Sequence, residues 1–181
     1  MASNAIVPAN LWQRVDHAER ALCLGINRGC RVPAVKRFFA VVSRLGDGSL
    51  WYALMLLLAV CGGADGAAAA ARMALTGVLG VGIYKLLKRH CVRERPYVMH
   101  EGILLGTAPL DRYSFPSGHT LHAVGFTLVA TAAVPELALV LLPFTVLVAA
   151  SRVVLGLHYP SDVLAGAALG LALGSAVLAL G

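Results

Sequence analysis

The stretch YSFPSGHT, residues 113–120, places a histidine at the start of a long apolar segment, directly after a turn of Pro, Ser and Gly. A helix that only anchors a chain in lipid needs no such turn, because the turn adds hydroxyl, imidazole and free N–H groups beside an apolar run. The N-terminus of a helix favours an anion through these N–H groups and the helix dipole. We therefore expect Ser117, Gly118 and His119 to hold an anion such as phosphate.

Two other stretches carry positive charge. They read KRHCVRERP over residues 88–96 and SRVVLGLHYPSD over residues 151–162. Lys88, Arg95 and Arg152 supply the cations, and a guanidinium fork matches phosphate oxygens in both shape and charge. Charged residues in the apolar part of a membrane protein are costly, and their usual role is functional. These three side chains are therefore predicted to bind phosphate.

A histidine and a carboxylate lie four residues apart in the last of these stretches. Asp162 can reach back to one imidazole nitrogen of His158, fix its tautomer and leave the other nitrogen free to attack. Pro160 between them suits the first turn of a final helix. We expect His158 to act as the nucleophile, Asp162 to orient it, and His119 to donate a proton to the leaving oxygen.

The elements that position these residues are predicted to be membrane helices. Of 181 residues, 59% are hydrophobic and 13% are charged, and the mean hydropathy of +0.77 is far above the range of soluble proteins. A spanning helix needs about 20 apolar residues. Five segments reach or approach this length: 48–63, 67–87, 119–134, 137–155 and 161–180. If their directions alternate, the three polar stretches meet on one side of the membrane and form one pocket.

The N-terminal part of the chain has a different pattern. Residues 1–47 mix apolar residues with many Arg and Lys, in LWQRVDHAERALCLGINRG and VPAVKRFFAVVSRLGDG. This pattern predicts two amphipathic helices that lie in the membrane interface beside the pocket. The predicted fold is thus an all-α polytopic membrane helix bundle with five or six spans. It divides into interfacial helices over residues 1–47 and a transmembrane core over residues 48–181. Gly166, Gly170 and Gly174 would let helix backbones in this core approach closely.

The three stretches together resemble the type 2 phosphatidic acid phosphatase superfamily. Its signature is KxxxxxxRP, then PSGH, then SRxxxxxHxxxD, and all three parts are complete and in order here, over residues 88–96, 116–119 and 151–162. The resemblance covers roughly residues 85–165. It implies metal-independent hydrolysis through a phosphohistidine. In that scheme Lys88, Arg95, Ser117, Gly118 and Arg152 bind phosphate, His158 attacks, His119 acts as the acid and Asp162 orients His158.

The topology departs from this family in one respect. Membrane members commonly have six spans, whereas five are counted here besides the amphipathic N-terminal region. Bacterial relatives usually work on the periplasmic face of the inner, or cytoplasmic, membrane, where we expect this multi-pass protein to lie. However, of 15 Lys and Arg only Arg72 falls on the side opposite the motifs, and the positive-inside rule would then make the motif side cytoplasmic. Both orientations stay open.

A lipid phosphatase is the function that these residues favour, with a membrane lipid phosphomonoester or pyrophosphate as substrate. One alternative is a haloperoxidase-like vanadate enzyme, which shares the same pocket, and another is a non-catalytic protein that binds or transports anions. No cofactor is expected. His122 follows His119 by three residues, but no Cys or carboxylate accompanies the pair in sequence, so no metal site is predicted. The net charge of +6 is assigned to anionic lipid and substrate, with no nucleic acid partner.

Overall fold

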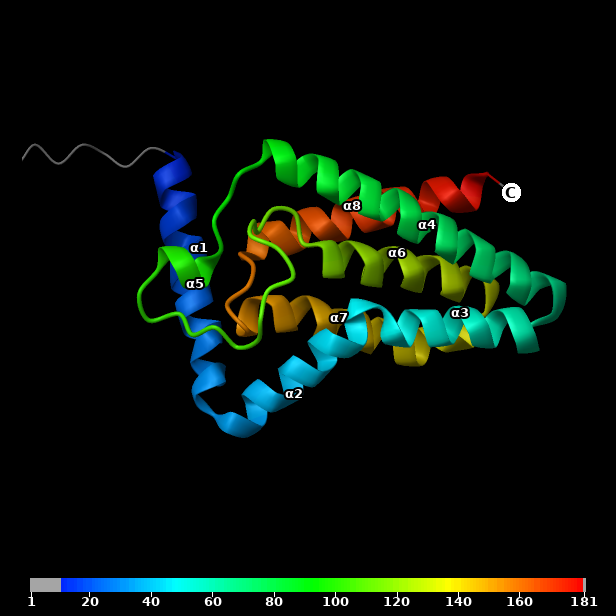
Figure 1. Cartoon of the computed structure of the whole chain (residues 1–181), viewed down its shortest axis with the longest axis horizontal. Coiled ribbons are helices and arrows are strands. Elements are labelled where there is room, and N and C mark those ends of the chain that lie inside the picture. Colours follow the sequence, from blue (N-terminus) through cyan, green and yellow to red (C-terminus); the bar gives the residue numbers. More distant parts are fainter. Residues whose placement is uncertain (1–10, 181) are drawn as a thin grey trace, which may run out of the picture.

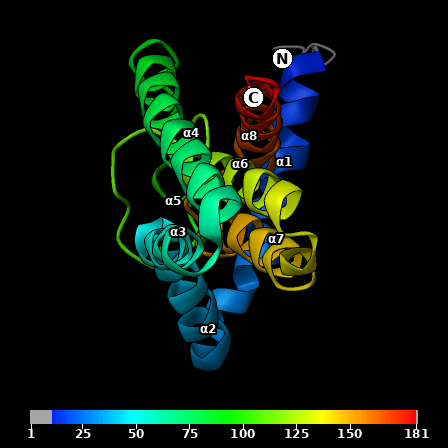
Figure 2. The ribbon, with the colours of Figure 1, turned by 90° about the vertical axis from the view of Figure 1, so that its right-hand side faces the viewer.

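The computed structural model describes residues 11–180, and among these it contains helices and connecting segments but no strand. Five helices form a bundle along one axis (Figure 1). Their bounds are Leu50–Cys61 for α3, Gly63–His90 for α4, Gly118–Ala133 for α6, Ala138–Val154 for α7 and Pro160–Ala179 for α8. Figure 2, viewed along the bundle, shows α6 in the middle. This agrees with the burial of Leu121, Ala123 and Ala130 on α6.

The N-terminal helices lie at one end of this bundle. Helix α1 (Leu11–Asn27) is roughly perpendicular to the bundle axis, and α2 (Pro33–Arg44) leads obliquely back to it (Figures 1 and 2). Four short elements complete the described chain: η1 (Arg28–Arg31), η2 (Leu45–Ser49), α5 (Pro96–Met99) and η3 (Pro135–Leu137). The predicted interfacial position of residues 1–47 stays a prediction, and its first ten residues lie outside the described part of the chain.

The predicted all-α membrane bundle is confirmed. Four helical stretches among the described residues are long and apolar enough to cross a membrane: Pro33–Cys61, Gly63–His90, Pro135–Val154 and Pro160–Ala179. The first differs from the predicted span over residues 48–63, because it also includes α2, which leads into α3 through the turn η2. The chain is kinked in this turn, where Gly48 has a non-helical backbone with a φ of 132°. Helix α6 has 16 residues, or about 24 Å at 1.5 Å per residue. The number of spans therefore stays a prediction.

An aromatic and aliphatic core joins four helices. Trp51 of α3 is 1% exposed, and its ring lies 5.4 Å from that of Phe126 on α6, measured between centroids. Met73 of α4 and Val148 of α7 are fully buried in the same cluster. The indole N–H of Trp51 donates to the carbonyl of Gly46 at 3.2 Å, so the core also fixes the turn η2. This turn leads toward the site described below.

Helices α6 and α8 approach closely because one face of α8 carries glycines. A Cβ atom at Gly166 would lie 2.5 Å from the carbonyl oxygen of Ser117, and one at Gly170 would lie 2.4 Å from that of Leu121. Real Cβ atoms do not come so near, so a side chain at either position would push the helices apart. The amide of Ser117 also donates to the carbonyl of Asp162 at 3.0 Å. The starts of α6 and α8 are thus held together.

This packing predicts a position-dependent effect of adding side chains to glycines. Gly170→Val should lower the thermal unfolding temperature in detergent, because overpacking a tight contact costs about 1–3 kcal/mol. Gly82→Val on the exposed face of α4 is the matched control, since a Cβ there meets no atom within 4 Å. Equal melting temperatures for the two purified variants would contradict the close α6–α8 contact.

Candidate active site

The three polar stretches meet at one end of the bundle. The end of α4, the start of α6, the end of α7 and the start of α8 all lie there, beside α1 (Figure 1). A cavity of about 640 Å³ opens at this end. Six of the eight predicted residues line it: Lys88, Arg95, Gly118, His119, Arg152 and His158. The other two, Ser117 and Asp162, are fully buried behind its wall.

His158 lies in the short connection between α7 and α8 and is 2% exposed. Its Nε2 is 3.3 Å from Nη1 of Arg95. Burial, and then the positive charges of Arg152, Arg95 and Lys88, lower the pKa of His158 well below its usual range, against a smaller opposite effect of Asp111. The lowered pKa favours the neutral imidazole at neutral pH. A neutral imidazole is the form that can attack an electrophilic phosphorus.

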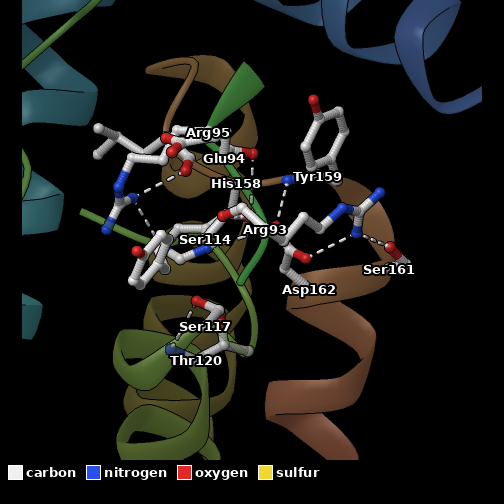
Figure 3. A network of polar contacts seen from close by, with 12 residues as sticks. Arg93, Glu94, Arg95, Ser114, Ser117, Thr120, His158, Tyr159, Ser161 and Asp162 are labelled. Carbon is white, nitrogen blue, oxygen red and sulfur yellow. Dashed lines mark hydrogen bonds and ion pairs between the residues drawn. The ribbon is translucent and has the colours of Figure 1, made fainter. Parts of the chain in front are cut away.

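Asp162 lies next to His158, as its spacing suggests. The distance from its Oδ2 to Nδ1 of His158 is 3.6 Å, which is longer than a hydrogen bond, and Nδ1 has no partner among the described residues. The carboxylate instead accepts from the amide of Tyr159 at 2.8 Å and from Nη1 of Arg93 at 2.8 Å (Figure 3). It therefore caps α8 while facing the imidazole. Catalytic hydrogen bonds commonly tighten only in the substrate complex.

Two of the predicted cations are bridged by a carboxylate that the sequence motifs do not include. Asp111 accepts from Nζ of Lys88 at 2.6 Å and from Nη2 of Arg95 at 2.7 Å. Arg95 is 1% exposed and also donates to the carbonyl of Leu157 at 2.8 Å. Burial opposes ionisation of Asp111, but the hydrogen bonds and charges of Lys88 and Arg95 outweigh it and lower the pKa of this carboxyl. Asp111 thus stays charged and offsets part of the cationic field.

Arg152 projects from the last turn of α7 and is 3% exposed. Its Nη1 donates to the hydroxyl of Ser43 on α2. Its Nε has no hydrogen-bond partner among the described residues. A buried N–H without a partner is unfavourable, and an anion in the cavity would satisfy it. Ser43 is not singled out by the sequence, because a lone Ser on an amphipathic helix carries no signal.

Gly118 and His119, at the start of α6, line the cavity. Nε2 of His119 lies 3.4 Å from Oδ1 of Asp47, which comes from the turn η2. The amides of Gly118 and His119 belong to the first turn, where N–H groups have no partner within the helix. The hydroxyl of Ser117 contacts the hydroxyl of Thr120 at 2.9 Å and caps the helix. Ser117 does not line the cavity, and its part in phosphate binding stays a prediction.

His122 also reaches the cavity but is held by backbone. Its Nδ1 is 2.9 Å from the carbonyl oxygen of Gly118, and its Nε2 is 3.3 Å from that of Gly77. Among the described residues, no group of three or more His, Cys, Asp or Glu is placed to hold a metal ion. The cavity is lined by three cationic side chains, by the start of α6 and by the buried His158, and its role in phosphate binding stays a prediction.

The bundle and its cavity are those of an integral-membrane protein with a polar site at one end. Comparison with known proteins identifies the family. A profile described as the PAP2 superfamily matches residues 66–180. The chain therefore belongs to this superfamily, as the resemblance of its three motifs predicts. The matched residues include α4, α6, α7 and α8 and all three polar stretches.

The chain is similar to named phosphatases and to a solved structure. It is 41% identical over 83 residues to a decaprenylphosphoryl-5-phosphoribose phosphatase of Mycolicibacterium smegmatis, covering 45% of this chain and 43% of that protein. It is 35% identical over 89 residues to a lipid A 1-phosphatase of Rhizobium johnstonii, covering 47% and 36%. The chain thus spans less than half the length of these relatives. The fold is similar to that of LpxE from Aquifex aeolicus, with a TM-score of 0.72 and 26% identity over 88% of this chain and 93% of that one.

The electrostatics of the site predict how His158 titrates. Because its pKa is lowered, the imidazole should stay neutral at pH 7 and take up a proton only as the pH falls below about 6.5. Carbon–proton NMR spectra of the histidine-labelled protein in phosphate-free detergent solution would show this, with His158→Gln assigning the resonance. A midpoint at or above the ordinary value would contradict the proposed environment.

Proposed function

We propose that this protein is an integral-membrane lipid phosphatase that hydrolyses a lipid phosphomonoester or pyrophosphate through a phosphohistidine. The observation that carries the proposal is the buried His158, which lines a cavity together with three cations and a second histidine. A site that only bound or carried anions would not need a nucleophile and a proton donor. The names of the two related phosphatases support a lipid phosphate as substrate.

In the proposed reaction the phosphate lies among Lys88, Arg95 and Arg152, with the amides at the start of α6 directed at its oxygens. Nε2 of His158 attacks phosphorus, and an N–P bond forms as the P–O bond to the lipid breaks. His119 gives its proton to the leaving oxygen. Water then attacks the phosphohistidine while His119 takes the proton back, which releases phosphate and restores both histidines.

The cavity wall supports a lipid rather than a soluble substrate. Trp51 and Met55 of α3 line the cavity together with Val78 and Val81 of α4. These apolar side chains lead from the polar end toward the membrane-spanning part of the two helices, so an acyl or prenyl chain could pass along them while its phosphate meets the cations. We expect the substrate to enter sideways from the bilayer, with its phosphate at headgroup level. The bacterial inner membrane is the proposed location.

The assignment of the nucleophile can be tested by substitution. His158→Ala should reduce phosphate release from a lipid phosphate by about a thousandfold or more, as the loss of a catalytic nucleophile does. His90→Ala is the matched control, because His90 lies at the same end of the bundle, is exposed and does not line the cavity. Substantial turnover by purified, folded His158→Ala protein would refute the role of His158.

The second test concerns metal independence. Because three cations can neutralise the transferring phosphoryl group, activity of the purified protein should survive EDTA. Vanadate can adopt the five-coordinate geometry of that group and should inhibit. Both are measured as phosphate release in detergent micelles. Loss of activity on chelation, with recovery on adding Mg²⁺, would show that the cations do not suffice.

A further inference from the structure

Helix α1 places a buried carboxylate beside the candidate active site. Glu19 is 7% exposed, which is unusual for Glu on a helix at the edge of a protein. Its Oε2 accepts from Nη2 of Arg93 at 2.6 Å, and its Oε1 accepts from the backbone amide of Ser161 at 2.8 Å. Glu19 therefore binds both an arginine of the α4–α6 connection and the first turn of α8.

Arg93 connects this carboxylate to Asp162. Its Nη1 donates to the hydroxyl of Ser161 at 2.7 Å and to Oδ1 of Asp162 at 2.8 Å, and Figure 3 shows the side chain reaching across the start of α8. The guanidinium also lies over the ring of Tyr159, 3.9 Å from its centroid. The motif pattern does not single out Arg93, although it lies inside KRHCVRERP, and Glu19 is 74 residues away from it.

These contacts fix the carboxylate that faces the nucleophile. Asp162 is fully buried, and a buried carboxylate stays charged only if it is paired and hydrogen-bonded. Arg93 provides the opposite charge, but its own side chain is 29% exposed, so its contacts must keep it from turning toward solvent. Glu19 holds the second nitrogen of the guanidinium, while Ser161 and the ring of Tyr159 contact the rest of it. The position of Asp162 beside His158 therefore depends on Arg93 and Glu19 as well as on the amide of Tyr159.

We propose that Glu19 and Arg93 are positioning residues that hold Asp162 for its action on His158, so that α1 belongs to the catalytic unit. The proposal rests on the proposed phosphohistidine function. It differs from a simple structural role of α1, because it places the effect of Glu19 on the chemical step. Helix α1 is also held at its far end, where Asn27 donates to the carbonyl of Val154 at 2.8 Å. Loss of Glu19 should therefore leave the helix docked.

The test uses the full chain in detergent micelles with a lipid phosphate as substrate. Glu19→Gln and Arg93→Ala should each lower kcat about tenfold or more, as loss of an orienting partner commonly does, with KM changed less than about threefold. Arg93→Lys should recover part of the loss, because it keeps one cation near Asp162. Arg20→Ala on the exposed side of α1 and Arg112→Ala in the α4–α6 connection are matched controls, which should leave kcat unchanged.

A double-substitution cycle separates positioning from stability. Single-turnover phosphate release is measured at high enzyme concentration in an Asp162→Asn background. Adding Glu19→Gln in this background should not lower the rate further. An equal loss of rate in both backgrounds would overturn the proposal, and so would a loss of rate that parallels a drop in the melting temperature. So would an unchanged kcat for Glu19→Gln while wild-type protein is active and His158→Ala is not. An inactive wild-type protein would instead refute the proposed function itself, and this proposal with it.

Discussion

Repulsion among three cations constrains how the residues at this end of the molecule can pack. Lys88, Arg95 and Arg152 line one cavity at the end of a membrane bundle, and the last two are 1% and 3% exposed. Charges that are buried in this way interact more strongly than charges in water. Two unit charges 4 Å apart interact by about 4 kcal/mol at an effective dielectric of 20. Asp111 offsets part of this by bridging two of the three. The positive charge that remains would hold a phosphate. The repulsion that opposes packing at this end of the bundle would therefore also provide the proposed phosphate binding.

The N-terminal helices complete the site. Three of the predicted catalytic or binding groups have a partner from this part of the chain: Ser43 contacts Arg152, Asp47 lies near His119, and Glu19 reaches Asp162 through Arg93. The family profile begins only at residue 66. The matched region therefore carries the motif residues, whereas the preceding helices bring side chains that contact them. These contacts join the two predicted units of the chain at the site.

The sequence predicts the fold well where the signal is local. Apolar runs give the helices α4, α6, α7 and α8, alternation of their directions brings the three motifs together, and the glycine spacing on α8 predicts close packing. It does not predict Asp111 or Glu19, because their contacts join distant segments: Glu19 and Ser161 are 142 residues apart. It does not predict the capping contact of Ser117 either, since a Ser at a helix start can either face a ligand or cap the helix.

The amphipathic pattern of α1 explains why the sequence does not single out Glu19. A charged residue on such a helix is expected to face water, yet Glu19, Cys23 and Asn27 are buried at four-residue spacing, while Leu22 and Ile26 are 53% and 42% exposed. The buried face of α1 is thus not the apolar face that a soluble amphipathic helix packs on its protein. Beside a membrane the arrangement is favourable, because lipid can cover Leu22 and Ile26. The polar face of α1 is then free to pack on the protein, where its carboxylate can hold Arg93.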